Sequence, residues 1–247
     1  MKKLFLFITI TFFFYQLAHS QKFIGSLIFG GNTTQIEGDA FKGFNKFGFN
    51  AGASVSLAFN KRQTWFATVE LLYTQKGSHL KSLVDSMYYP DKSYIDQTVP
   101  YNEKVKYHLA MDYVEVPVMF HFEDPRTGVA FGLGFSWGRL VRISELENGY
   151  MLKTSLGTGT YKRDDWAALV DVKFKLYKNL KFNIRFQHSI APIRTRAFVS
   201  TNEVRGQVHQ VLTLRLIYSF NEKYKLNTRM DKTGQRMGAK WIRDIDD

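Results

Sequence analysis

Apolar residues recur at every second position in many separate stretches of this chain, and this feature most restricts its fold. From Phe47 to Phe59 the odd positions are all apolar, whereas the even positions are glycine, serine, asparagine or alanine. Successive side chains of a β-strand point to opposite faces, so the alternation predicts a strand with one apolar face and one small or polar face. A wall between lipid and a narrow polar lumen needs those two faces.

The same reasoning predicts eight strands along the chain, each about as long as a tilted strand needs to cross a bilayer. The first is apolar and glycine-rich, and its two faces are not clearly sorted. The expected strands cover residues 23–31, 47–59, 65–74, 113–122, 129–138, 166–176, 180–187 and 212–220.

The connections between these strands alternate without exception between short and long. The short ones are residues 60–63, 123–128 and 177–179, and the long ones are 31–46, 76–108, 141–164 and 191–206. Aromatic residues gather at both ends of the strands, as they do in the interfacial girdles of membrane barrels. The sequence therefore predicts an all-β fold, namely an eight-stranded antiparallel transmembrane up-and-down β-barrel with short periplasmic turns and long external loops.

The two ends of the chain differ from the predicted barrel. Lys2 and Lys3 precede an apolar stretch from Leu4 to Phe14, and Ala18-His19-Ser20 has the pattern of a cleavage site. We therefore expect residues 1–20 to be a signal peptide, 21–220 the barrel and 221–247 a charged periplasmic tail, either disordered or a docking segment. The expected location is the outer membrane of a Gram-negative bacterium.

Charge and cysteine content exclude several classes of function. The formal net charge is +12, but the basic residues are scattered and the predicted export argues against nucleic acid as a partner. The chain has no cysteine, which excludes a thiol nucleophile, a cysteine zinc site and disulfides. We expect no metal site and no cofactor.

Ionisable residues at inward positions form the main candidate site. An eight-stranded barrel is only wide enough for side chains to fill, and an unpaired charge inside it would be costly. Opposed strands are expected to bring Glu70 toward Arg185, and Glu115 toward Arg215. The prediction is a set of ion pairs that plugs the lumen, with a gated ion path as the alternative. Its members are Glu70, Glu115, Asp171, Lys173, Arg185 and Arg215.

Enzymatic chemistry finds little support in the sequence. No spacing offers a serine, a histidine and a carboxylate on one face, as a lipid hydrolase or acyltransferase would need. The glycines at 132, 134 and 138 lack the context of a phosphate loop and are interpreted as small inward residues of a tight barrel. We expect a non-enzymatic barrel, with a lipid-modifying enzyme and a narrow channel as weaker alternatives.

The expected loop of residues 76–108 is rich in tyrosine, which is a favoured residue of exposed interfaces. A solvated loop with a short hairpin of its own is an equal alternative. The expected partners are outer-membrane lipid and other envelope proteins, reached through the loops or the tail. The candidate contact residues are Tyr88, Tyr89, Tyr94 and Tyr101.

Three motifs resemble those of the PorT-type outer-membrane barrels. They are G-F-N-A-G-A at residues 48–53, D-Y-V-E-V-P-V at 112–118 and A-F-G-L-G-F-S at 130–136, and the resemblance covers roughly residues 21–220. It implies an eight-stranded barrel of OmpA-like architecture. Because the PorT protein itself belongs to the type IX secretion and gliding machinery, the resemblance also implies an accessory role in an outer-membrane secretion machinery as an alternative function.

Overall fold

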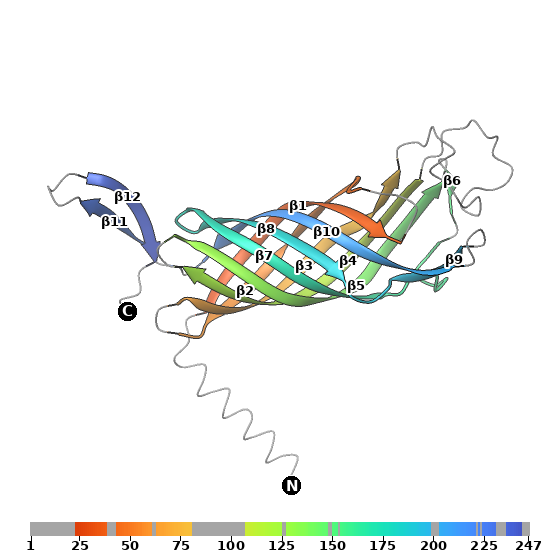
Figure 1. The fold of residues 1–247 in the computed structure, drawn as a ribbon, viewed down its shortest axis with the longest axis horizontal. Helices are drawn as coiled ribbons and strands as arrows, with labels where there is room; N and C mark the ends of the chain where they lie inside the picture. Colours follow the sequence, from red (N-terminus) through yellow and green to blue (C-terminus); the bar gives the residue numbers. More distant parts are fainter. Residues whose placement is uncertain are drawn as a thin grey trace, which may run out of the picture.

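Eight long antiparallel strands close into a barrel in the computed structural model (Figure 1). The structure describes residues 23–38, 43–60, 63–80, 107–124, 127–147, 150–152, 154–198, 203–220, 222, 224–230 and 236–243. The barrel strands are β1 (Phe23–Glu37), β2 (Lys46–Ala58), β3 (Trp65–Leu80), β4 (Tyr107–Asp124), β5 (Val129–Glu147), β7 (Asp164–Tyr177), β8 (Leu180–Ser189) and β10 (Glu203–Ser219). Each pairs with the next, and β10 pairs with β1 from Ser26↔Ser219 to Glu37↔Val208, which closes the ring.

The predicted alternation of connections is confirmed. Short turns join β2 to β3, β4 to β5 and β7 to β8, and all lie at one end of the barrel, here called the turn side (Figure 1). Two of these turns place a non-glycine residue in the left-handed region, Gln63 at φ 48° and Lys178 at φ 38°, and the third uses Gly128 at φ 71°. The longer connections lie at the opposite end, here called the loop side.

The strands extend further on the loop side than the sequence predicted. β3 continues to Leu80 and β5 to Glu147, so parts of the expected long loops are strand. Two short strands also lie there, β6 (Tyr150–Met151) against β5 and β9 (Arg194–Phe198) against β10. These segments lack the apolar alternation because they extend beyond the apolar band, where neither face needs to contact lipid.

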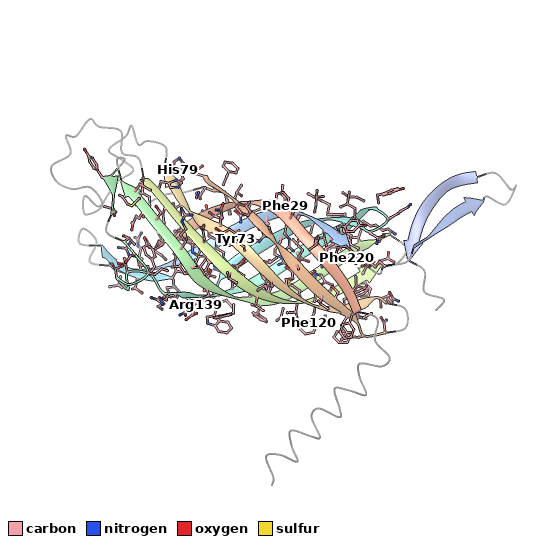
Figure 2. All side chains as sticks on the ribbon, turned by 180° about the vertical axis from the view of Figure 1, so that it is seen from behind. Phe29, Tyr73, His79, Phe120, Arg139 and Phe220 are labelled. Atoms are coloured by element: carbon pink, nitrogen blue, oxygen red, sulfur yellow. The ribbon has the colours of Figure 1, made fainter. Side chains whose placement is uncertain are left out.

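The two faces of each strand are sorted as predicted. Outward residues such as Phe131 and Leu133 are more than 60% exposed, whereas inward Met119 is fully buried. Figure 2 shows the aromatic side chains of Phe120 and Phe220 on the outer surface near the turn side. Strand β1, whose faces the sequence left unsorted, turns Phe29 outward and Ile28 inward. The ambiguity arose because β1 carries apolar residues on both faces.

Beyond the barrel, β11 (Tyr224–Met230) and β12 (Arg236–Arg243) form a separate antiparallel hairpin. This hairpin lies at the turn side, in the segment for which the sequence left disorder and docking open (Figure 1). Among the residues that the structure describes, none forms a helix long and apolar enough to cross a bilayer. The expected signal peptide lies outside the described residues.

Candidate functional site

Four charged side chains meet across the lumen nearest the turn side, in what we call the turn-side charge layer: Glu70, Asp171, Arg185 and Arg215. Arg185 donates from Nη1 and Nη2 to the two oxygens of Glu70, both at 2.8 Å, and from Nη2 to Asp171 Oδ2 at 2.7 Å. Arg215 donates from Nη1 to Glu70 Oε2 at 2.9 Å and from Nε to Asn183 Oδ1 at 2.8 Å. All four side chains are at most 3% exposed. The expected contact of Glu70 with Arg185 is therefore present.

Two inward glycines make room for this layer. A Cβ at Gly30 would collide with Leu214 O and lie 2.9 Å from Arg215 Cγ, so the missing side chain lets the backbone of β10 and the base of the arginine side chain lie close to β1. A Cβ at Gly132 would collide with the ring of His121 and lie 2.5 Å from Asp171 Oδ1. The prediction that Gly132 is a small inward residue of a tight barrel thus agrees with its surroundings, and these glycines are needed for close approach rather than for turns.

The expected pairing of Glu115 with Arg215 is wrong. Glu115 instead contacts Lys76 Nζ at 2.6 Å, and Lys76 also lies 2.8 Å from Asp165. We call Lys76, Glu115 and Asp165 the loop-side charge cluster. The error came from counting residues up from the turns, since tilted and staggered strands place equal counts at unequal heights. Gln187 completes the coordination of Glu115 by donating a hydrogen bond at 3.0 Å.

Lys76 was missed because the predicted strand of residues 65–74 ended before it, and Asp165 because the predicted strand of residues 166–176 began after it. Lys76 has the same inward parity as Glu70 on β3, and Asp165 has the parity of Asp171 on β7. Extending each alternation by a few residues would have found both. Lys76 is fully buried and its ammonium also lies 5.0 Å from the ring centre of Tyr113, so it is enclosed on several sides.

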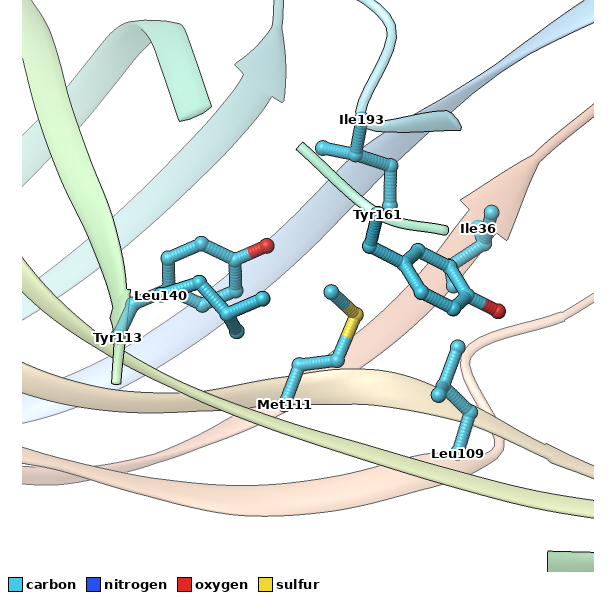
Figure 3. Packing of buried hydrophobic residues seen from close by; sticks show 7 residues of the cluster. All are labelled: Ile36, Leu109, Met111, Tyr113, Leu140, Tyr161 and Ile193. Carbon is cyan, nitrogen blue, oxygen red and sulfur yellow. The ribbon is translucent and has the colours of Figure 1, made fainter. Parts of the chain in front are cut away.

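A cluster of buried apolar side chains lies at the loop side of the lumen, and we call it the loop-side apolar cap (Figure 3). Tyr161 and Ile193 come from the connections after β5 and β8 and pack down onto the barrel strands, as Figure 3 shows. Ile193 is fully buried. The cap consists of Ile36, Leu109, Met111, Tyr113, Leu140, Tyr161 and Ile193.

Polar contacts hold the connections of the cap in place. Tyr107 donates a hydrogen bond of 2.6 Å to Glu145 Oε1, and Tyr161 lies 3.5 Å from the same oxygen. Arg194 donates to the Tyr161 hydroxyl at 2.9 Å. Burial, together with the nearby Glu145 carboxylate, raises the pKa of Tyr161, so its hydroxyl stays protonated and can act as a donor. The connections are therefore anchored to the barrel rather than lying free above it.

A hydroxyl, an imidazole and a carboxylate form a chain that sequence reasoning did not find. Thr68 Oγ1 lies 3.3 Å from His121 Nδ1, and His121 Nε2 lies 3.0 Å from Asp171 Oδ1. The three residues come from β3, β4 and β7, all at inward positions. The sequence predicts that all three side chains point inward, but only the closed ring of strands shows that they are neighbours.

The remaining predicted site residues have less definite places. Lys173 points inward as predicted, but it joins none of the ion pairs within the described part of the chain. It lines an open cavity at the turn side together with Lys181, Glu123 and Glu222. The tyrosines at 88, 89, 94 and 101 lie outside the described residues, so their predicted contact role stays a prediction. Among the residues that the structure describes, no group of three or more histidine, aspartate or glutamate side chains could hold a metal ion.

Comparisons with solved structures return other outer-membrane barrels. Ail, the attachment invasion locus protein of Yersinia pestis, is 15% identical over 80% of this chain and 98% of its own, with a TM-score of 0.44. Neisserial surface protein A is 11% identical over 81% and 99%, with a TM-score of 0.44. OprG from Pseudomonas aeruginosa is 10% identical over 80% and 95%, with a TM-score of 0.36. No curated protein matches the chain in sequence.

The family comparison covers most of the barrel. Residues 20–194, which run from before β1 to the start of β9, match the family described as the outer membrane protein beta-barrel domain. A protein that spans the outer membrane needs a closed ring of strands with an apolar outer face, and this barrel has both, together with a polar interior. The protein is located in the outer membrane, and the chain belongs to the outer membrane protein beta-barrel domain family.

Proposed function

We propose that this protein is a closed, non-enzymatic outer-membrane barrel that acts through contacts at its loop side. The observation that carries the proposal is that buried side chains meet inside the lumen at both sides of the barrel. The turn-side charge layer joins β3, β7, β8 and β10 across the barrel, and the loop-side apolar cap packs across the lumen near the other end. A barrel of this size leaves no space for a channel once such side chains meet.

Conductance in planar lipid bilayers tests the closure. We expect no steady conductance from the wild-type protein. The double variant Arg185→Ser, Arg215→Ser removes both guanidinium groups and leaves Glu70 and Asp171 in the lumen. Combined with Tyr161→Ala and Ile193→Ala, which remove two side chains of the loop-side apolar cap, it should leak cations. Arg142→Ser, which removes an arginine whose side chain is 77% exposed, is the matched control and should stay silent. Steady ion-selective current through the wild type would refute the closure and favour a channel.

The loop side offers the exposed residues of an interaction surface. Tyr150 is 78% and Met151 74% exposed on β6, at the loop side of the barrel. Exposed aromatic and methionine side chains are enriched at protein interfaces. A photo-crosslinking residue at position 150 should capture an envelope partner, whereas the same residue at the outward Phe131 should capture only lipid. Capture of lipid alone at both positions would contradict an interaction surface here.

A second candidate is an accessory subunit of an outer-membrane secretion machinery. It is favoured by the resemblance of residues 112–118 to PorT-type barrels and by the β11–β12 hairpin, a folded element outside the barrel at the turn side. Affinity purification from outer membranes should then recover machinery components with the full chain and lose them when the chain ends at Phe220. Recovery that does not depend on residues 221–247 would exclude docking through the hairpin.

The Thr68, His121 and Asp171 chain supports a structural role better than a catalytic one. Asp171 already binds Arg185, and the 3.3 Å separation of Thr68 from His121 is long for an activated hydroxyl. The backbone N–H groups of the surrounding strands pair within the sheet, so they cannot form an oxyanion hole. A fluorophosphonate probe should therefore not label the protein. Labelling that disappears in Thr68→Val would establish a nucleophile and overturn the proposal.

A further inference from the structure

Two histidines lie next to each other on the outer face of the barrel at its loop side, away from the contacts inside the lumen. His79 on β3 and His108 on β4 are directly opposite each other in the sheet, and Figure 2 labels His79 at that end of the barrel. Both are partly exposed, whereas their chain neighbours Ser78 and Leu109 are buried and point inward. The two imidazoles therefore face outward, beyond the apolar band, where ions of the medium can reach them.

The ring nitrogens of the two histidines converge. His79 Nδ1 and His108 Nδ1 are 3.1 Å apart, and the rings meet edge to face with their centres 5.2 Å apart. A bond from zinc to an imidazole nitrogen is about 2.0–2.1 Å long, so two nitrogens on one zinc ion are about 3.3–3.4 Å apart at a tetrahedral angle and about 2.8–3.0 Å apart at a right angle. The observed separation lies between these values. The two nitrogens are therefore already spaced as ligands of one metal ion.

The hydrogen bond that the two rings can share does not prevent metal binding. A neutral imidazole carries one proton, and each ring can hold that proton on Nε2, which leaves the lone pair of its Nδ1 available to a metal ion. Neither His79 nor His108 lies within ion-pair distance of a carboxylate in the described part of the chain. No ion pair therefore has to break before a metal ion binds.

The sheet fixes the positions of both histidines. β3 and β4 remain paired on either side of them, so two ligands carried by these strands lose little conformational freedom when a metal ion binds. His188 lacks this arrangement, although it is the other partly exposed histidine in the part of the chain that the structure describes. It is paired with Ala168 and Gln210 in the sheet and faces no second imidazole.

One nearby cation limits the affinity of the pair. Lys46 on β2 acts electrostatically on His108, and Asp112 opposes the charge of this lysine. A dication at the two imidazoles is therefore repelled, but only by a partly compensated charge. The described residues supply no third ligand, so water would complete the coordination of the ion. These features fit an open site of moderate affinity and not a closed structural metal centre.

We propose that His79 and His108 form a binding site for one divalent transition-metal ion from the external medium, zinc or copper, with water in its remaining coordination positions. Imidazole nitrogen is a preferred ligand of both ions, whereas calcium and magnesium prefer oxygen and should not bind. The bound ion would join the outer ends of β3 and β4, which the chain connects through residues 81–106 with their predicted contact tyrosines. The sequence predicted no metal site, because two histidines so far apart along the chain become a pair only through the register of the strands.

The test is a calorimetric titration with zinc chloride of the protein purified from outer membranes, without a polyhistidine tag and in a detergent solution free of chelators. We expect one saturable site for zinc and no heat of binding for magnesium. Copper(II) in place of zinc should give a pulsed electron paramagnetic resonance spectrum with the remote nitrogens of two imidazoles. The absence of saturable zinc binding, or a copper spectrum with a single imidazole, would overturn the proposal.

Variants of the histidines identify the ligands. His79→Gln and His108→Gln should each raise the dissociation constant for zinc by about tenfold or more, because the loss of a group that only orients a metal ligand already costs about 10–100-fold. His188→Gln is the matched control and should leave the constant unchanged. All three variants change partly exposed side chains and should fold, which an unchanged shift of gel migration on boiling verifies. Zinc binding that survives both His79→Gln and His108→Gln would overturn the site.

The nearby lysine provides a test of the opposite sign. Lys46→Met removes a positive charge that acts on His108 and should lower the dissociation constant for zinc about two- to fivefold, the range expected of one screened surface charge. A metal ion bound elsewhere on the barrel would not respond in this way. Weaker or unchanged zinc binding in Lys46→Met would contradict a site at the histidine pair.

Discussion

The two halves of the lumen contain different kinds of contact. On the turn side, Glu70, Asp171, Arg185 and Arg215 join opposite walls through ion pairs and hydrogen bonds. On the loop side, a single ammonium in the loop-side charge cluster sits beneath an apolar cap built partly from connecting segments. The first set of contacts comes from the strands alone, whereas the second needs the connections to fold back onto the barrel.

The difference shows what each half depends on. Charges inside a lipid-surrounded ring must find partners within that ring, because water is scarce and a stranded ion is costly. Beyond the apolar band, connections such as those carrying Tyr161 and Ile193 can supply apolar side chains to the lumen. The turn-side closure should therefore govern the stability of the whole barrel, and the loop-side cap should govern local opening.

The largest effect is expected from Arg185→Ala. It leaves Glu70 and Asp171 without their main partner, and breaking a buried pair costs about 3–5 kcal/mol. Glu70→Ala added to it should recover part of the loss, since the carboxylate is no longer stranded. Urea unfolding in lipid gives the four free energies of unfolding for the cycle. Arg142→Ala, which removes an exposed arginine, is the control; additive losses at 70 and 185 would show that the two residues are not coupled.

The cap should respond differently. Ile193→Ala removes a fully buried side chain and should cost about 2–5 kcal/mol where the site cannot collapse. If the cap opens by itself, the loss will appear as faster hydrogen exchange of residues near Tyr161, with little change in the exchange of β3 and β8. Ile190→Ala, at a position that is 60% exposed, is the matched control. Equal acceleration throughout the barrel would mean that the two halves open together.

Much of the turn-side half could be predicted from the sequence. The period-two pattern gave the inward parity of Glu70, Asp171 and Arg185, because lipid on one face and lumen on the other force strict alternation. The pairing of Glu70 with Arg185 followed from counting strands around a ring. The same counting failed for Glu115 and Arg215, because residue counts carry no information on how far neighbouring strands are staggered.

The loop-side half was largely beyond such reasoning. Lys76 was assigned to a loop because apolar alternation stops where lipid no longer contacts the strand. Tyr161 and Ile193 carry no periodic signal, since they lie in connections whose paths depend on tertiary contacts such as those of Glu145 and Arg194. The proximity of Thr68, His121 and Asp171 required the closed ring, because these residues lie more than 45 positions apart in sequence.

A smaller loss of stability is expected from Gly132→Ala, which adds a side chain next to the turn-side charge layer. Gly132→Ala would force a methyl group against His121 and Asp171, and overpacking of this kind costs about 1–3 kcal/mol. Gly31→Ala is the control, because a Cβ there meets only Gly48 O at 3.8 Å. Thermal unfolding of both variants in the same detergent gives the comparison. If the Gly132→Ala protein unfolds at the same temperature as the Gly31→Ala protein, the turn-side charge layer can shift without a loss of stability.

The smallest effect is expected from ending the chain at Phe220. Closure of the ring is complete by then, since β10 pairs with β1 up to Ser219, and Phe220 donates its N–H to Gly25 O at 2.6 Å. Glu222 of the tail lies 2.9 Å from Lys181 of the barrel, and Lys181 retains Glu123 at 3.6 Å when the tail is removed. The shortened protein should therefore insert into the outer membrane and show the same change in gel migration on boiling as the full chain. Its stability should fall no further than that of Glu222→Gln in the full chain, because both lose the same contact. A shortened chain that fails to insert while Glu222→Gln inserts normally would place the β11–β12 hairpin in the assembly of the barrel itself, and the comparison of the two halves would then have to include it.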